Sequence, residues 1–512
     1  MYLTAQNIYR VLNVTLTLAR HDALFPLKRV SLASSIIASI RFLVRKQTHG
    51  RPGERLARAF QQLGPSFIKL GQALSTRPDI IGSEVASDLS KLQDDLPPFP
   101  TPEARNVIEI EFGTKLEVLF SEFDEVPLAA ASIAQVHLAI TIEGKPVAVK
   151  ILRPGVEKAF QKDLDLLLWV AKLIEYSHTD IRRLKPVEVI RTFQETTRME
   201  MDLRLEAAAA EEIKQNFHND PDFEVPSIDW QRTSKRVMTL DRIQGIPIDE
   251  RELLIKNGFD PKEVLSRAAG ALFKQVFRDG FFHADQHPGN LFVGENGQII
   301  AIDFGIMGRL DKPTRQFLGE MLLSFLNRDY SRVAEIHFEA GYVRSYKSVH
   351  AFSQACRAIA EPILDKPQHE ISIAGLLAQL FQVAKTFEME TQPQLLLLQK
   401  TMLVAEGVGR KLSPEINLWF LAQPLIEEWF AENMGTETII MNKLEEASEG
   451  LRKIPRLLSE IEKRALGSAE NGLRLHPDTS RGIGISSNHT NKSNIRLYTF
   501  IIIILIAILA LA

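Results

Sequence analysis

Three side chains near the middle of the chain have the types and spacing of a site that transfers a phosphoryl group from a magnesium-bound nucleotide. Asp285 lies in the stretch His283–Asn290, Asn290 follows it by five residues, and Asp303 opens the sequence D-F-G. In phosphoryl-transfer sites with this spacing, the first Asp takes the acceptor proton, and the Asn and the second Asp bind Mg²⁺. We therefore predict that Asp285 is the catalytic residue and that Asn290 and Asp303 are the metal ligands.

The segment between the two metal ligands is expected to fold as a β-hairpin. Two short apolar runs, residues 291–293 and 298–302, flank a turn that contains Asn-Gly. Apolar runs around Asn-Gly are the strongest short-range signal for a hairpin. Such a hairpin would bring Asn290 and Asp303 to the same end of a lobe.

A site of this kind also needs a lysine for the inner phosphates, and Lys150 is the candidate. It ends the run Val147–Lys150, which matches the V-A-I-K strand of protein kinases. Upstream, residues 129–136 read A-x-A-x-x-A-x-V where the kinase phosphate loop reads G-x-G-x-x-G-x-V. Alanine is small but restricts the dihedral angles that glycine allows, so we expect a stiffer loop that grips phosphate differently. A helix is plausible by propensity for so alanine-rich a stretch, but we favour the loop because Val136 and His137 continue toward a strand that ends at Lys150. The predicted ATP-binding loop comprises Leu128, Ala129, Ala130, Ala131, Ser132, Ile133, Ala134, Gln135 and Val136.

The alanine loop and two further motifs resemble the UbiB family of atypical kinase-like proteins, which is associated with ubiquinone biosynthesis. Lys69–Gln72 matches the family's K-x-G-Q signature, Glu200–Asp202 matches its E-x-D motif, and Glu206 stands for the αC-type glutamate. The ordered motifs cover residues 55–310, about half of the chain. One departure is Thr239–Asp241, at the hinge where the family often has Glu. The other departure is in the C-terminal tail, where we expect one membrane segment and some members of the family have two.

The resemblance implies an atypical protein-kinase-like bilobal fold of the α+β class with an N-terminal helical extension. In that fold Glu206, on a helix-favouring run, would hold Lys150 as the αC glutamate of kinases does. The K-x-G-Q helices would fold over the place where a protein substrate docks, and Lys69 would reach into the nucleotide pocket and pair with Glu200. Without the resemblance, Lys69 would be interpreted as a surface lysine. The family-specific site residues are Lys69, Gln72, Glu200 and Asp202.

The composition is that of a globular protein, and we expect no nucleic-acid partner. Hydrophobic residues make up 45% of the 512 residues and charged residues 24%. The net charge is −3, so there is no overall basic field to attract nucleic acid. Cys356 is the single cysteine, which excludes an internal disulfide framework and is typical of a reducing compartment.

The order of these features suggests six segments. Two apolar runs near the N-terminus, residues 8–18 and 30–44, have Arg at helical spacing. They indicate either helices that face the core or helices that lie on a membrane surface. No A-P-E sequence follows Asp303, which favours ATP hydrolysis or a small acceptor over a peptide. The predicted segments are N-terminal helices at 1–50, a helical extension with K-x-G-Q at 51–125, a small lobe at 126–245, a large lobe at 246–435, a helical segment and flexible linker at 436–496, and a transmembrane anchor at 497–512.

The C-terminal run 497–512 carries no charge and is rich in Ile and Leu. As a helix it would be about 24 Å long at roughly 1.5 Å per residue. That is short against a hydrocarbon core of about 30 Å, and local thinning of the bilayer or a homodimer would accommodate it. Lys492 and Arg496 precede the run. Because positive charge stays on the cytoplasmic side, we expect a C-terminal anchor in a bacterial inner membrane with the catalytic body in the cytoplasm.

These features together predict a membrane-anchored atypical kinase or ATPase that binds ATP and Mg²⁺. The resemblance adds a role in ubiquinone biosynthesis, in which the protein would act on, or present, lipid quinone precursors or the biosynthetic complex. The expected partners are therefore membrane lipid, quinone precursors and ubiquinone biosynthesis proteins. The alternative is a catalytically weak lipid-binding or scaffold protein gated by nucleotide. A direct ring hydroxylase lacks support, because the sequence has no flavin fingerprint, haem motif or iron facial triad.

Overall fold

In a computed structural model of the chain, the described residues belong to one compact unit within Met1–Phe430. Within that part of the chain, no helix combines the length and the apolar character needed to cross a membrane. The run 30–44, the linker and the anchor predicted at 497–512 lie outside the described residues. The structure describes residues 5–24, 49–75, 81–89, 92, 97–177, 186–364, 379, 382–384, 386–389, 393–415, 421 and 424–429.

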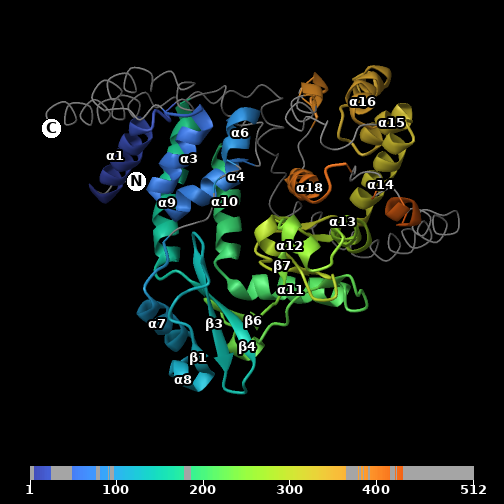
Figure 1. The fold of residues 1–512 in the computed structure, drawn as a ribbon. Coiled ribbons are helices and arrows are strands. Elements are labelled where there is room, and N and C mark those ends of the chain that lie inside the picture. The colour runs from blue at the N-terminus through green and yellow to red at the C-terminus, as the bar shows by residue number, and fades with distance from the viewer. Residues whose placement is uncertain are drawn as a thin grey trace, which may run out of the picture. The chain divides into compact units, whose positions relative to one another are not determined.

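An antiparallel sheet forms the centre of the small lobe (Figure 1), with strand order β1-β3-β4-β6 and β2 paired with β3. Successive side chains of a strand point to opposite faces. On β4, Val147, Val149 and Ile151 are therefore buried on one face, and Lys150 points to the other. The buried face packs against helices α7 and α8. The elements are α7 (Thr101–Phe112), α8 (Leu116–Leu119), β1 (Phe120–Phe123), β2 (Ala129–Ala130), β3 (Ala134–Thr141), β4 (Pro146–Leu152), a 3₁₀ turn η3 (Trp230–Arg232) and β6 (Val237–Asp241).

A helical layer is inserted between Lys150 and Glu206, and the N-terminal helices pack against it (Figure 1). Phe60 and Phe67 of the N-terminal helices share one apolar core with Phe160 and Phe193 of the insertion. The N-terminal elements are α1 (Ala5–Arg20), α3 (Pro52–Leu63), α4 (Pro65–Ser75) and α6 (Ser83–Leu89), and the inserted elements are α9 (Val156–Ser177) and α10 (Pro186–Glu200). Helix α11 (Leu203–Asn216) follows the insertion and carries Glu206.

Helix α1 packs part of the apolar run 8–18 against the protein core. Val14 and Leu18 pack against the shared core, and the Arg10 guanidinium lies 2.6 Å from the Asp163 carboxylate of α9. The described apolar residues Val14 and Leu18 therefore face protein, and a membrane contact of this helix stays a prediction.

The large lobe is mostly helical, with two small sheets beside the predicted catalytic loop. One sheet has the order β5-β10-β9-β7, and β8 pairs with β11 in the other. Leu291 of β9 pairs with Ala301 of β10, which confirms the predicted hairpin. Gly297 in its turn has φ +78°, a value that favours glycine. The elements are β5 (Phe223–Glu224), β7 (Ile246–Pro247), α12 (Arg251–Lys256), α13 (Pro261–Phe273), a π-helical turn η4 (Lys274–Asp279), β8 (Phe281–His283), a 3₁₀ turn η5 (Pro288–Asn290), β9 (Leu291–Val293), β10 (Ile299–Ala301), β11 (Met307–Arg309), α14 (Lys312–Leu326), α15 (Tyr330–Glu339), α16 (Val349–Leu364) and α18 (Pro393–Leu412).

Helix α14 begins almost directly after the D-F-G sequence. The Asp311 carboxylate caps it by accepting a hydrogen bond from the Thr314 backbone N–H at 2.9 Å. Residues 304–311 are thus all that separates Asp303 from the helix, and β11 takes up part of that stretch. The eight residues between Asp303 and α14 are too few for a long activation segment at this point of the chain.

We predict that Gly308→Ala destabilises the protein, because a Cβ at this position of β11 would overlap the ring of Phe282 on β8. Overpacking a buried contact of this kind costs about 1–3 kcal/mol. The same substitution at Gly407 is the control, since Gly407 is exposed on α18 and nothing lies within 4 Å of a Cβ there. Gly407→Ala should instead stabilise by about 0.5–1 kcal/mol. Denaturant unfolding of both variants gives the two signs, and a Gly308→Ala variant as stable as the parent would contradict this packing.

Candidate active site

Lys150, Glu206 and Asp303 form one charged cluster that joins the two lobes. The Lys150 ammonium lies 2.6 Å from Glu206 Oε1 and 3.2 Å from Asp303 Oδ1. Lys150 and Glu206 are largely buried, whereas the Asp303 side chain is 48% exposed. Glu206 lies in the first turn of α11, so the expected pairing of a strand lysine with an αC-type glutamate is present.

Burial and neighbouring charges shift the pKa values of Lys150, Glu206 and Asp303. Burial opposes a charge on Lys150, but the carboxylates of Asp303 and Glu206 outweigh it and raise the Lys150 pKa. Burial also raises the pKa of Glu206 to about 7. The Asp303 side chain is 48% exposed, so burial opposes its charge only in part, and the ammonium of Lys150, with a further contribution from Lys69, holds the Asp303 pKa well below its usual range. At neutral pH the cluster therefore keeps a cation for phosphate and an anion for metal.

The hairpin β9–β10 brings the two predicted metal ligands together. The Ile302 backbone N–H donates to the Asn290 carbonyl oxygen at 2.9 Å, so Asp303 follows directly from this closing bond. Asp303 has φ +59°, a left-handed backbone conformation that residues other than glycine seldom adopt. Such backbone outliers cluster at functional sites, where the surrounding structure holds them. The conformation is consistent with a ligand role for Asp303.

Buried hydrogen bonds fix the catalytic loop before Asn290. His283 is fully buried, and its Nε2 lies 3.1 Å from the Ile302 carbonyl oxygen while its Nδ1 accepts from the Asp285 backbone N–H. Burial lowers the pKa of His283, which favours the neutral ring that this pattern requires. The Asn290 side-chain N–H donates to the Asp285 carbonyl oxygen at 3.0 Å. Because that amide nitrogen donates, the amide oxygen is the atom that a metal would bind.

The alanine loop is a tight hairpin rather than an open loop. Ala129 pairs with Val136 across β2 and β3, so only residues 131–133 form the turn. The Ala131 N–H donates to the Ala134 carbonyl oxygen at 2.7 Å, and the Arg153 guanidinium donates to the Ala131 carbonyl oxygen at 3.2 Å. These bonds make a stiff turn. The helical alternative for this stretch is therefore wrong.

Two polar side chains of the alanine loop differ in their partners. The Gln135 amide bonds to the Phe99 backbone and lies 2.7 Å from His137 Nε2, so this side chain anchors the segment before α7. Ser132 is fully buried, and its hydroxyl has no hydrogen-bond partner in the described part of the chain. Buried polar groups are normally bonded, so an orphaned hydroxyl in this turn suits a phosphate oxygen.

Two of the four family-specific residues form a largely buried ion pair, and the other two make hydrogen bonds to the backbone. The Lys69 ammonium on α4 lies 3.3 Å from Glu200 Oε2 at the end of α10, which is the pairing that the resemblance implied. Gln72 donates to the Leu92 carbonyl oxygen at 3.4 Å. Asp202 caps α11 by accepting from the Arg204 backbone N–H at 3.2 Å. The structure thus gives Gln72 and Asp202 structural contacts, and their roles toward a nucleotide stay predictions.

Lys400 on α18 is a site residue that the sequence motifs did not reveal. Its ammonium lies 2.9 Å from Asp285 Oδ1, although the two residues are 115 positions apart. The available signal was weak: Lys400 is the only charged residue in the stretch 393–405. A lone lysine in an apolar helix has no motif of its own.

The donor set fits a magnesium ion that arrives with a nucleotide. Within the described residues, no group of three or more His, Cys, Asp or Glu side chains could hold a metal ion. Mg²⁺ is commonly bound by one or two protein ligands, with substrate phosphates and water completing the shell. Asn290 and Asp303 are such a pair, and Lys150 and Ser132 supply groups suited to the phosphates.

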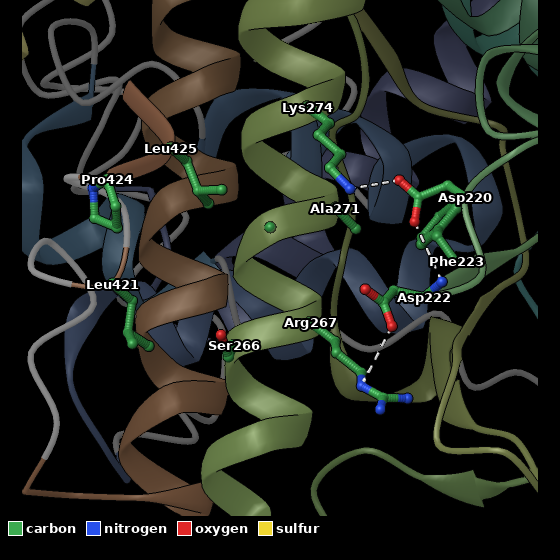
Figure 2. Close-up of a pocket in the computed structure, with 11 residues that line it drawn as sticks. Asp220, Asp222, Phe223, Ser266, Arg267, Ala271, Lys274, Leu421, Pro424 and Leu425 are labelled. Carbon is green, nitrogen blue, oxygen red and sulfur yellow. Dashed lines mark hydrogen bonds and ion pairs between the residues drawn. The ribbon is translucent and has the colours of Figure 1, made fainter. Parts of the chain in front are cut away.

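A separate cavity of about 230 Å³ lies beside α13 in the large lobe (Figure 2). Its charged groups pair with one another, since the Lys274 ammonium lies 2.5 Å from Asp220 and the Arg267 guanidinium lies 3.4 Å from Asp222. Its other wall is apolar, with Leu421 and Leu425. Because the charges are already neutralised in pairs, we place the chemistry at the Lys150 cluster and the catalytic loop.

Comparison with known proteins gives matches over both the lobes and the C-terminal helices. Residues 91–337 match the family model of the ABC1 atypical kinase-like domain, and residues 356–417 match the UbiB helical domain. A probable protein kinase UbiB from Marinobacter nauticus is 43% identical over 82% of this chain and 78% of its own. Another from Shewanella putrefaciens is 41% identical over 89% of this chain and 85% of its own. The solved complex of Rv3197 with erythromycin from Mycobacterium tuberculosis is 25% identical, with a TM-score of 0.52 over 78% of this chain and 98% of that one.

We predict that Asp303→Asn weakens the magnesium-dependent binding of ATP by about tenfold or more, because the substitution removes the only carboxylate of the proposed two-residue metal site. Asp249→Asn is the matched control, since Asp249 pairs with Lys411 at 2.9 Å and is not part of the Lys150 cluster. Titration of each variant with MgATP, with and without a metal chelator, measures the effect. Equal MgATP affinities for the parent and Asp303→Asn would remove Asp303 from the metal site.

Proposed function

The chain belongs to the UbiB family of atypical kinase-like proteins, and from that premise we propose that it is a membrane-anchored kinase or ATPase that supports ubiquinone biosynthesis. One observation carries the proposal: Lys150 contacts both Glu206, at 2.6 Å, and Asp303, at 3.2 Å. Kinase-like catalysis requires two features at the same time. One is the ion pair between the strand lysine and the helix glutamate, and the other is the D-F-G Asp in position to bind Mg²⁺. Here the ion pair is formed, and the D-F-G Asp lies beside it in the same cluster.

Each residue of the site has a defined task in this proposal. Lys150 binds the inner phosphates of ATP, and the alanine turn with Ser132 lies over them. Asn290 and Asp303 would hold Mg²⁺, which when bound neutralises phosphate charge and fixes the orientation of the phosphates. Asp285 accepts a hydrogen bond from the attacking hydroxyl or water and takes its proton. The neutral His283 keeps the Asp285 backbone in place through a 3.1 Å hydrogen bond.

The acceptor that we propose is small or is water. A peptide acceptor in kinases is supported by a long activation segment, but here residues 304–311 lead directly into α14. The charge-free run 497–512 is proposed to anchor the protein in the inner membrane. A substrate with a polyprenyl chain is dissolved in the same bilayer, so anchoring raises its effective concentration at the site. A lipid quinone precursor fits both requirements, and the names of the relatives support the pathway.

A second candidate function is a nucleotide-gated protein that binds or presents lipid precursors with little turnover. One contact favours this function: the Lys400 ammonium lies 2.9 Å from Asp285 Oδ1. It occupies a carboxylate oxygen that would otherwise take the proton from the attacking hydroxyl or water. A nucleotide would then act as a ligand that changes the conformation of the protein.

Steady-state ATP hydrolysis by the full chain in phospholipid vesicles separates the two functions. For the kinase or ATPase we expect turnover that falls by about a hundredfold or more in Lys150→Met, since the variant loses a charge on the phosphates. MgATP binding without turnover would instead select the gated binding protein. A chain that neither binds nor hydrolyses MgATP would contradict the proposed function.

Deletion of Arg496–Ala512 tests the membrane part of the proposal. We expect a protein that keeps MgATP binding, because the nucleotide motifs end by Gly305, but that no longer supports quinone synthesis in cells. The control replaces the deleted run with an unrelated transmembrane helix, which should restore quinone levels. Quinone extracted from cells grown on a respiratory carbon source gives the readout. Full quinone levels from the deleted form would show that the anchor is dispensable.

A further inference from the structure

Lys400 is the charged residue at the site to which the proposed function gives no task. Its ammonium lies 2.9 Å from Asp285 Oδ1, and the two side chains are 30% and 28% exposed. Ion pairs that remain partly in water contribute little to stability, because solvent screens them and the long side chain loses freedom. Stability therefore does not account for a lysine that is held on the catalytic carboxylate.

The position of Lys400 is set by the packing of its helix. Thr401 is fully buried, and its hydroxyl donates to the Leu397 carbonyl oxygen at 3.0 Å. Leu398 and Met402 pack against the large-lobe core that contains Phe277. The backbone of Lys400 is thus fixed beside the catalytic loop. The flexible four-carbon side chain of Lys400 still allows its ammonium to move by a few ångströms.

The cations of the site are unevenly distributed between its two ends. At the end formed by the small lobe, Lys150 is held by Glu206 and Asp303, and Lys69 is held by Glu200. At the other end, the catalytic loop from Asp285 to Asn290 contains no Lys or Arg.

His287 in that loop accepts a hydrogen bond from the Gly289 backbone N–H at its Nδ1. Phosphoryl transfer places negative charge on the oxygens of the transferring group, and a cation there accelerates the reaction strongly. Lys400 brings a cation to this end of the site from another part of the chain.

Building on the proposed function, we propose that Lys400 binds the terminal phosphate of ATP. When the nucleotide enters, the Lys400 ammonium moves from Asp285 Oδ1 to an oxygen of that phosphate, and Asp285 is freed to accept a hydrogen bond from the attacking hydroxyl or water. The acceptor oxygen then forms a bond to the γ-phosphorus as the bond to the β–γ bridging oxygen breaks. ADP leaves with that electron pair, the acceptor proton passes to Asp285, and Lys400 keeps its own protons.

This role links the region that matches the UbiB helical domain to the nucleotide. Lys400 lies within residues 356–417, outside the ABC1 kinase-like match. Its ammonium would recognise a group that ATP has and ADP lacks. The expected signature is therefore a selective loss of ATP affinity, whereas a residue that merely supports the fold would affect both nucleotides alike.

The test compares Lys400→Met, Lys400→Arg and the parent as full chains in phospholipid vesicles. Lys411→Met is the matched control, because Lys411 lies on the same helix and pairs with Asp249 at 2.9 Å instead of Asp285. We expect Lys400→Met to weaken binding of a magnesium-bound, non-hydrolysable ATP analogue by about tenfold or more, with MgADP affinity within about twofold of the parent. ATP turnover should fall by about a hundredfold. Lys400→Arg should restore most of the analogue affinity, since arginine keeps the charge.

Other outcomes would overturn the proposal. Equal losses of analogue and MgADP affinity in Lys400→Met would show a structural role, and unchanged affinities would show no role in nucleotide binding. Faster turnover in Lys400→Met would make Lys400 a brake on Asp285. If the parent binds both nucleotides and the ratio of their affinities does not change in Lys400→Met, only the role of Lys400 fails. If the parent binds neither nucleotide, the proposed function fails and this role fails with it.

Discussion

The rest of the site depends on one buried ammonium group, that of Lys150. A charge removed from water costs on the order of several kcal/mol unless opposite charges and hydrogen bonds surround it. The two carboxylates that meet this need come from different elements, Glu206 from α11 and Asp303 from the end of the β9–β10 hairpin. A strand, a helix and a hairpin must therefore reach one point in space, and the small-lobe sheet is thereby joined to the catalytic loop.

The added helices extend the same electrostatic arrangement outward. Lys69 and Glu200 lie on α4 and α10, two helices that share one apolar core, and their ion pair is largely removed from water. The charge of Lys69 also lowers the pKa of Asp303, so the N-terminal helices influence the predicted metal ligand. Helix α18 places Lys400 on the catalytic carboxylate. Helices α4 and α18, which both lie outside the ABC1 kinase-like match at 91–337, thus act on Asp303 and Asp285 respectively.

The sequence predicted the parts of the site that lie close together in the chain or that belong to a motif. The hairpin after Asn290 follows from Asn-Gly between apolar runs, and the pairing of Lys150 with Glu206 follows from the motif that each residue carries. The alanine turn was expected as a covering loop, but hydrogen bonds to Arg153, which no local pattern shows, make it a closed hairpin. Lys400 was not identified because its contact with the catalytic loop is between residues far apart in the chain. An apolar helix pattern predicts that a helix is buried but not which site lies beside it.

The helical insertion before Glu206 also affects the free energy of forming the site. Lys150 and Glu206 are 56 residues apart, and closing a flexible chain of that length costs about 3.5 kcal/mol in chain entropy. A hydrogen bond between charged groups contributes about 1.5–3 kcal/mol, which does not offset that cost. Helices α9 and α10, which pack against each other, replace a flexible loop with an ordered connection and so lower that cost. Local unfolding of this insertion would restore the cost, so assembly of the Lys150 cluster depends on the order of two helices that contribute no residue to it.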